Sequence, residues 1–315
     1  MRHPATAYTR REALRKIAAL GAGASLCPDY ALGTPGRKPQ GYNPTLSVEV
    51  YCWVQRFEAQ KKSLPDGVEE MLAGTEKAGY RNVELSDAFL TRDQSARILA
   101  LLKKYKLRMP TFYAGTTLHE PAAAEKSIRE TVDLAKAVKS AGVRAVVTNP
   151  SPKPDHQQKT AEELEVQAKY LNQLGAELQK LGLRFMVHHH TPELVDHARE
   201  WRYQLQYTDP KLVRCCVDVD WAVRGGEEPL AFVRETGERL LSLHLRNDYR
   251  GVWMEDFGNG DIDYSPIAAY LREINYTGYL VVELAYEKYT EVTRPLVEDL
   301  QRSRLYAEKV FGVKA

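Results

Sequence analysis

The stretch Val187-His188-His189-His190 ends a short apolar run, and three comparable stretches follow it along the chain. These are Val217-Asp218-Val219-Asp220, Leu243-His244-Leu245-Arg246 and Val282-Glu283. Each of the first three is followed by a helix-like segment, which is typical of parallel strands whose carboxyl ends meet at one rim. Strand ends that carry His, Asp, His and Glu offer the nitrogen and oxygen donors that bind divalent metals. The pattern therefore predicts a metal site at one rim of a β/α barrel.

The same alternation of short apolar runs and longer helical patterns extends outward over the chain from residue 46. It predicts strands at 48–53, 81–85, 108–113, 144–148, 184–188, 213–217, 240–245 and 279–284. It predicts helices at 67–78, 94–105, 122–140, 160–181, 193–201, 230–235, 267–274 and 293–310. This alternation indicates a closed parallel sheet, so we expect a single (β/α)8 TIM barrel over residues 46–315. A doubly wound open sheet would need a glycine-rich phosphate loop after the first strand, and residues 50–55 contain none.

Four of the predicted strands follow a turn that contains glycine, namely Gly79, Gly142, Gly182 and Gly278. A residue in the left-handed conformation commonly ends a helix, and glycine adopts that conformation at the lowest cost. We therefore expect each of these glycines to end the preceding helix in this way.

Residues 1–33 have the composition of an export signal. Arg10 and Arg11 precede a short Gly- and Ala-rich apolar run, which is the order found in twin-arginine signals. The run is too short to remain in a bilayer as a helix, so we expect a periplasmic or exported protein without membrane contact after cleavage. The bulky Leu26 argues against lipid attachment at Cys27. The competing interpretation is a basic tail without a targeting role.

The composition fits one large enzyme domain. The chain has 315 residues with a hydrophobic content of 43%, which is enough for the core of a barrel. A formal net charge of +2 does not favour nucleic acid or a membrane surface as a partner. None of the four cysteines lies in a Cys-x-x-Cys pair, so we expect neither a disulfide framework nor a zinc–cysteine site. A polar linker rich in Gly and Pro is expected at 34–45.

Side chains alternate along a strand, so the polar residues at each strand end divide between two faces. His188 and His190 therefore share one face, and His244 and Arg246 share one face of their own strand. Each residue also has an ordinary explanation, since a strand-end His can be a surface group and an Asp can cap a helix. Polar ends on four successive strands are better explained by one shared metal ion.

From residue 46 onward the chain resembles the sugar phosphate isomerase/epimerase family, which has a xylose-isomerase-like barrel and includes inosose dehydratases, ketose 3-epimerases and endonuclease IV. The matching motifs are Val187-His188-His189-His190 with Glu193, Val217-Asp218-Val219-Asp220-Trp221, His244-Leu245-Arg246-Asn247, Gly258-Asn259-Gly260-Asp261-Ile262-Asp263 and Val282-Glu283-Leu284. The resemblance implies metal ligands at Asp218, His244 and Glu283, and a fourth ligand on the fifth strand. Epimerases have Glu at that fourth position, whereas this chain has histidines, as in the branch of inosose dehydratases and 3-keto-glycoside lyases. We place the fourth ligand at His188, with His190 as the other candidate.

The resemblance also implies a reaction at a carbon beside a carbonyl group. A divalent ion, Mn²⁺ first and Mg²⁺, Co²⁺ or Zn²⁺ as alternatives, would stabilise the enediolate that forms when a proton is removed. The candidates for the base are Glu283, His190 and Glu84. The residues expected to contact substrate are Arg246, Trp221, Glu193 and Glu255, the last of these in a long loop at 251–258.

Some of these residues have a second interpretation. Glu84 could form a buried ion pair with an arginine, Trp221 could belong to the core, and the loop at 251–258 could be a surface loop packed by Trp253 alone. Arg246 and Asn247 also stand where the family usually has Lys-Asp, which argues against lysine-dependent chemistry.

Four functions are compatible with this pattern. The first is a metal-dependent isomerase or epimerase that acts on a free sugar. The second is an exported lyase or dehydratase that acts by β-elimination on a keto-sugar, keto-inositol or 3-keto-glycoside. The third is a carbohydrate-binding barrel without catalysis, and the fourth, an endonuclease-IV-like phosphodiesterase, would need more histidines on other strands. The substrate is expected to be a small carbohydrate, and the sequence leaves open whether the protein forms a homo-oligomer.

Overall fold

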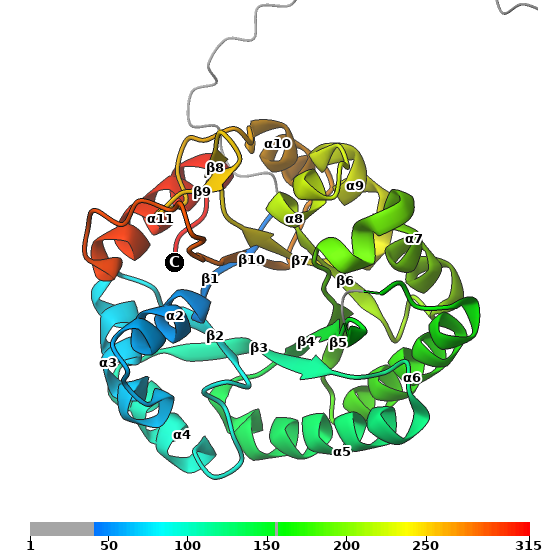
Figure 1. Cartoon of the computed structure of the whole chain (residues 1–315). Coiled ribbons are helices and arrows are strands. Elements are labelled where there is room, and N and C mark those ends of the chain that lie inside the picture. Colours follow the sequence, from blue (N-terminus) through cyan, green and yellow to red (C-terminus); the bar gives the residue numbers. More distant parts are fainter. Residues whose placement is uncertain (1–40, 155–156) are drawn as a thin grey trace, which may run out of the picture. The chain divides into compact units, whose positions relative to one another are not determined.

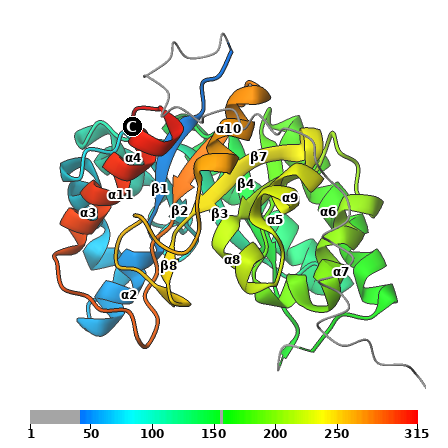
Figure 2. The ribbon, with the colours of Figure 1, turned by 90° about the horizontal axis from the view of Figure 1, so that it is seen from above.

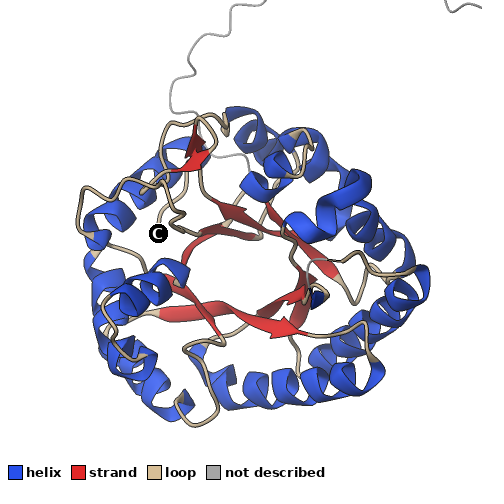
Figure 3. Ribbon diagram, viewed as in Figure 1, coloured by secondary structure: helices blue, strands red, loops and turns tan. Residues whose placement is uncertain are grey.

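The structure is a computed structural model that describes residues 41–154 and 157–315. Eight parallel strands form a closed barrel in the order β1-β10-β7-β6-β5-β4-β3-β2, and helices surround it (Figures 1 and 3). The barrel strands are β1 (Thr45–Glu49), β2 (Asn82–Ser86), β3 (Arg108–Thr116), β4 (Ala145–Pro150), β5 (Arg184–Val187), β6 (Arg214–Asp218), β7 (Leu240–Leu245) and β10 (Tyr279–Val282). The predicted TIM barrel is confirmed.

Most helices connect one barrel strand to the next. They are α2 (Tyr51–Ala59), α3 (Leu64–Lys77), α4 (Ser95–Lys104), α5 (Pro121–Val138), α6 (Ala161–Lys180), α7 (Thr191–Tyr207), α8 (Val219–Arg224), α9 (Pro229–Glu235), α10 (Ser265–Glu273) and α11 (Leu296–Phe311). Short 3-10 turns, Lys139–Ala141 and Gly237–Arg239, precede β4 and β7, and a small hairpin of β8 (Asp248–Tyr249) and β9 (Val252–Trp253) follows β7. Figure 2 shows α2, α8 and β8 at the same end of the barrel, which is the end where the strands terminate.

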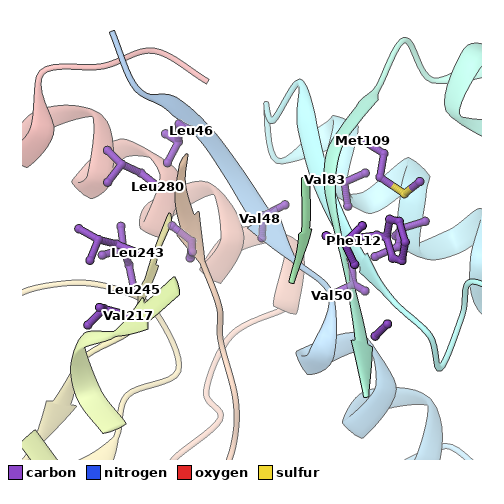
Figure 4. Close-up of a cluster of buried hydrophobic side chains, with 14 of the residues drawn as sticks. Leu46, Val48, Val50, Val83, Met109, Phe112, Val217, Leu243, Leu245 and Leu280 are labelled. Atoms are coloured by element: carbon purple, nitrogen blue, oxygen red, sulfur yellow. The ribbon is translucent and has the colours of Figure 1, made fainter. Parts of the chain in front are cut away.

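Apolar side chains fill two separate layers. The larger layer lies between the strands and the surrounding helices and includes Leu46, Val48, Val83, Leu243 and Leu280 (Figure 4). The smaller layer consists of Ala145, Val147, Met186, Cys216, Leu241, Tyr279 and Val281. Since side chains alternate along a strand, the residues between the outward-facing ones point into the barrel. The inner layer therefore forms a floor below the polar strand ends.

The first predicted strand, 48–53, is wrong over most of its length. Strand β1 ends at Glu49, and helix α2 begins at Tyr51. The buried residues of α2 are Cys52, Trp53, Val54 and Phe57, a spacing that forms one stripe of a helix. A short apolar run fits a buried strand and a buried helix equally well, so its periodicity did not decide between them.

A second helix was missed because it begins without a loop. Helix α8 follows β6 directly, and Asp218 is both the last residue of the strand and the N-cap of the helix. The Oδ1 atom of Asp218 accepts a hydrogen bond from the backbone N–H of Trp221 at 2.9 Å. This cap satisfies one of the free N–H groups in the first turn of the helix.

Three of the four turn glycines have the predicted left-handed conformation. The φ angles of Gly79, Gly142 and Gly182 are 91°, 91° and 72°. The prediction is wrong for Gly278, since the left-handed residue of that turn is Asn275 with φ 52°. A Cβ atom on Gly278 would lie 2.3 Å from the carbonyl oxygen of Leu241, so close packing explains this glycine.

The predicted export signal at 1–33 and most of the linker at 34–45 lie outside the described residues. The barrel begins one residue earlier than predicted, at Thr45. Within the described part of the chain, no helix combines the length and the apolar character needed to cross a membrane.

Candidate metal and active site

Four buried side chains meet at the carboxyl ends of four adjacent strands. Asp218 ends β6, His244 is the penultimate residue of β7, and His188 and Glu283 directly follow β5 and β10. The barrel order places β5, β6, β7 and β10 side by side. One ligand atom from each of these residues lies within 4.8 Å of the ligand atoms of the other three. The structure thus brings together the metal set implied by the sequence, although His188, Asp218, His244 and Glu283 lie far apart along the chain.

The imidazole of His244 lies between two carboxylates. Its Nδ1 atom is 2.6 Å from Oε2 of Glu283, and its Nε2 atom is 3.0 Å from Oε1 of Glu84. Burial alone would lower the pKa of His244, but Cys216, Glu84 and Glu283 together raise it well above its ordinary value. Glu84 therefore pairs with a histidine, and the alternative interpretation, a buried ion pair with an arginine, is not found among its described contacts.

His188 is the least satisfied side chain of the group. Its side chain is fully buried, and neither ring nitrogen has a hydrogen-bond partner among the described residues. Its Nε2 atom is 3.8 Å from Oδ2 of Asp218, and its ring lies 4.7 Å from that of His244. Burial lowers the pKa of His188 well below its ordinary value, so the ring is neutral and has a free lone pair. Buried polar atoms rarely lack a partner, and a metal ion would supply one here.

Arg246 links two of the carboxylates. Its Nη2 atom is 2.5 Å from Oδ2 of Asp218 and 2.9 Å from Oε2 of Glu283. Burial works against ionisation of Glu283, but Arg246 and His244 hold the pKa of this carboxyl well below its usual range. Arg246 thus keeps the carboxyl group of Glu283 ionised, and its own positive charge balances part of the negative charge of the two carboxylates. It also competes with any bound cation for the same oxygens.

Glu49 is a further buried carboxyl that the sequence analysis missed. It ends β1, is 3% exposed, and its Oε2 atom accepts a hydrogen bond from the backbone N–H of Tyr51 at 2.5 Å. Burial raises the pKa of Glu49 well above its usual range, and the neighbouring Glu283 and Glu84 raise it further. The alternation of apolar and polar residues from Leu46 to Glu49 could have revealed this strand end if the strand had been placed correctly.

His190 and Glu193 lie at the start of helix α7. The backbone N–H of His190 donates to Oε2 of Glu193 at 2.7 Å, so Glu193 caps the helix. Burial raises the pKa of Glu193 to about 7 and lowers the pKa of the His190 imidazole to about 4. The His190 ring lies 4.8 Å from the His188 ring and 5.5 Å from Trp221, so it adjoins the four-residue cluster.

Two tryptophans lie beside Arg246. The guanidinium carbon lies 5.7 Å from the centre of the Trp221 ring and 4.9 Å from that of Trp253. Trp253 also donates from its indole nitrogen to Oδ1 of Asp220 at 2.8 Å. The two rings meet edge to face at 5.2 Å, so the loop that carries Trp253 packs against the strand-six end of the site.

Glu255 is bound elsewhere in the same loop. Its carboxylate accepts hydrogen bonds from the backbone N–H and the hydroxyl of Thr293 at 2.7 Å and 2.6 Å. It also forms an ion pair of 2.8 Å with Arg294. Glu255 therefore binds the segment before α11. It does not lie with the four-residue cluster.

Known proteins resemble this chain in sequence and in fold. The family model described as xylose isomerase-like TIM barrel matches residues 72–307. An inosose dehydratase from Geobacillus kaustophilus is 22% identical over 278 residues, covering 76% of this chain and 90% of that protein. One from Clostridium perfringens is 29% identical over 167 residues, which is 47% of this chain and only 55% of that protein.

Solved structures share the same architecture. A sugar phosphate isomerase/epimerase from Parabacteroides distasonis has a TM-score of 0.68 and 17% identity, covering 86% of this chain and 100% of that one. The 3-keto-D-glucoside 4-epimerase from E. coli has a TM-score of 0.66 and 13% identity, covering 85% of this chain and 100% of that one. At these identities the likeness concerns the fold.

Proposed function

The chain belongs to the xylose isomerase-like TIM barrel family. We propose that it is a divalent-metal-dependent sugar isomerase or epimerase. The family and the inosose dehydratase relatives support a sugar-acting enzyme. The observation that carries the metal-dependent reaction is the buried cluster of His188, Asp218, His244 and Glu283. The reaction would remove a proton beside a carbonyl group and pass through an enediolate.

The donor set fits a divalent cation. Two imidazoles and two carboxylates match the preference of Mn²⁺ for nitrogen and oxygen ligands, and His188 has no other described partner for its nitrogens. When bound, such an ion would polarise the substrate carbonyl and stabilise the negative charge of the enediolate. Glu84 would act behind His244 by holding its imidazole in place.

We assign the proton transfer first to His190. Its imidazole is neutral above pH about 4, because burial lowers its pKa to that value, and its ring is half-buried beside His188. Glu283 remains the second candidate, but its carboxylate is already engaged by His244 and Arg246. Glu84 is fully buried behind His244, which favours a positioning role over contact with substrate.

Arg246 and the two tryptophans are proposed to hold the sugar. The guanidinium has donors that suit carbonyl and hydroxyl oxygens, and the half-buried faces of Trp221 and Trp253 suit the apolar face of a sugar ring. Glu193, whose Oε1 atom has no described partner, is a further candidate for a hydroxyl contact.

Elimination is the second candidate function. The three histidines that follow β5 and the inosose dehydratase match over 90% of that relative's length favour a lyase acting on a keto-sugar, keto-inositol or 3-keto-glycoside. Both reactions begin with removal of the same proton, and loss of a β-oxygen replaces return of the proton. A carbohydrate-binding barrel without catalysis would perform neither step.

The test is proton exchange in deuterated water with Mn²⁺ and a panel of keto-sugars. Deuterium in the α-carbon of an intact sugar would support epimerisation, and an enone chromophore would support elimination. Exchange should be lost in Asp218→Asn and kept in Arg108→Gln, which lies at the opposite end of the barrel. Absence of exchange with every keto-sugar would leave the binding-protein function and contradict both enzymatic ones.

We also propose that residues 1–33 direct export to the periplasm. The support is the order of paired arginines and apolar run, which lies outside the described residues. A reporter fused to residues 1–33 should leave the cytoplasm, and replacing Arg10 and Arg11 together by lysine should block this. Unchanged export in the double variant would contradict the twin-arginine assignment.

A further inference from the structure

Cys216 lies directly below the proposed metal site. It precedes Asp218 by two residues on β6, so both side chains point to the same face of the strand. Cys216 belongs to the inner apolar floor of the barrel and is fully buried. Its Sγ atom, one ring nitrogen of His188 and one of His244 all lie within 4.8 Å of each other.

Two donor sets therefore overlap at this position. The first combines His188 and His244 with the carboxylates of Asp218 and Glu283, and the second combines the same histidines with the thiol of Cys216. A nitrogen–oxygen set suits Mn²⁺, whereas a nitrogen–sulfur set suits Zn²⁺ and softer ions. The free ring nitrogens of His188 are an independent sign that this position is incomplete without a ligand.

We propose that His188, Cys216 and His244 form a second binding mode for a thiophilic divalent cation such as Zn²⁺, Cd²⁺ or Co²⁺. This inference rests on the proposed role of the two histidines as metal ligands. On binding, the Cys216 thiol gives its proton to water, the sulfur–metal bond forms, and no oxidation or reduction takes place. Because both modes use His188 and His244, a cation held by the sulfur excludes the ion held by the carboxylates.

The chain provides a matched control in the adjacent residue. Cys215 is as deeply buried as Cys216, but it belongs to the outer apolar layer between strands and helices. Substitution of Cys215 therefore tests the general effect of losing a buried thiol. Substitution of Cys216 tests the loss of a thiol at the site.

The experiment is an anaerobic titration of the full chain with Co²⁺, followed by absorption. Ligand-field bands in the visible report Co²⁺ in either mode, and a sulfur-to-cobalt charge-transfer band in the near ultraviolet appears only if a thiolate binds. We expect the charge-transfer band in the native protein and in Cys215→Ser, and its loss in Cys216→Ser. The affinity for Cd²⁺ should fall at least about tenfold in Cys216→Ser, a loss usual when support for a bound metal is removed.

The outcomes separate this inference from the proposed function. Ligand-field bands without charge transfer in the native protein would overturn the role of Cys216 and leave the metal-dependent function intact. Absence of both kinds of band would overturn both. If Cys216→Ser fails to fold, as judged by circular dichroism, the ¹¹³Cd resonance of the native protein decides, since a sulfur ligand gives a strong downfield shift and its absence would contradict the proposal.

Discussion

The two ends of the barrel have opposite chemistry. At the carboxyl end, imidazoles and carboxylates are buried against one another, as in the His244–Glu283 contact of 2.6 Å. At the amino end, six strands begin with or directly follow an arginine: Arg81, Arg108, Arg144, Arg184, Arg214 and Arg239. The formal net charge of +2 is a sum over both ends and does not reveal this separation.

The difference lies in how well the polar groups are satisfied. Arg214 donates to the carbonyl of Glu238 at 2.7 Å, Arg239 to the hydroxyl of Thr208 at 2.8 Å, and Arg184 to the hydroxyl of Tyr279 at 2.8 Å. These cations also lie near the carboxyl ends of the helices, where the helix dipole favours positive charge. The arginines of the amino end are thus explained by their contribution to stability. At the carboxyl end, the ring nitrogens of His188 have no hydrogen-bond partner among the described residues.

Cavity size does not separate the two ends, because cavities of about 470 Å³ and 410 Å³ lie beside loops of the carboxyl end, lined among others by Asp87, Gly115 and Trp253. A cavity of about 510 Å³ lies at the amino end, lined among others by Arg184, Arg214 and Tyr276. The four-residue cluster at the carboxyl end is instead buried. The ring nitrogens of His188, which have no described partner and lie close to the other three candidate ligands, therefore indicate the candidate site more directly than open volume does.

The largest expected effect is loss of metal binding in Asp218→Asn. The change removes one of two carboxylates from the donor set, so the affinity for Mn²⁺ should fall by more than about 100-fold, beyond the loss typical of outer-shell changes. Isothermal titration calorimetry measures the dissociation constant for Mn²⁺ in the variant and in the native protein. Arg214→Gln at the amino end is the control, and an equal loss there would refute the functional contrast between the ends.

The second-largest effect is expected on the stability of the protein, from a substitution at the amino end of the barrel. Gly278→Ala would place a Cβ atom 2.3 Å from the Leu241 carbonyl oxygen, so the strand β10 must shift. We expect a free energy of unfolding lower by about 1–3 kcal/mol, as for overpacking of a tight site. Urea denaturation measures the change. An unchanged free energy of unfolding would contradict the close contact between Gly278 and Leu241.

A smaller effect is expected for Glu84→Gln. Glu84 lies 3.0 Å from Nε2 of His244, so its neutralisation should weaken Mn²⁺ binding about tenfold through the orientation of the imidazole. Titration of the variant beside the native protein gives the ratio of dissociation constants. Identical constants would mean that Glu84 does not position His244.

The smallest effect is expected for Arg108→Gln. Arg108 is exposed, and its side chain forms no ion pair with a carboxylate of the described residues. The free energy of unfolding should change by no more than about 0.5 kcal/mol, as for most surface substitutions. A loss of several kcal/mol in thermal or urea unfolding would show that the amino-end arginines act together as a structural unit.

The sequence was most informative where strand ends are polar and the preceding runs are short. The periodicity predicted the barrel, and the polar strand ends predicted one shared metal site. The resemblance to the sugar phosphate isomerase/epimerase family implied the ligands Asp218, His244 and Glu283, with His188 or His190 as the fourth. It failed at β1, because the apolar run that continues into α2 fits a strand as well as a helix, so the strand was placed too late and Glu49 was missed as a strand end.

Other features depend on tertiary contacts that no local pattern contains. Glu255 is an acidic residue in a loop that was expected to cover the active site. Its partners are Thr293 and Arg294, which lie on a different segment. Gly278 looks like a helix-ending glycine and is instead required by the approach of Leu241. Contacts of this kind are fixed only when the barrel closes.

The placement of the tryptophans gives the molecule an intrinsic optical reporter. Trp53 and Trp201 are 2% and 0% exposed, so a soluble quencher should hardly reach them. Trp221 and Trp253 are half-buried, and both rings lie beside the guanidinium of Arg246. Emission accessible to acrylamide should therefore come mainly from this pair, and shielding by a bound sugar would be visible without any label.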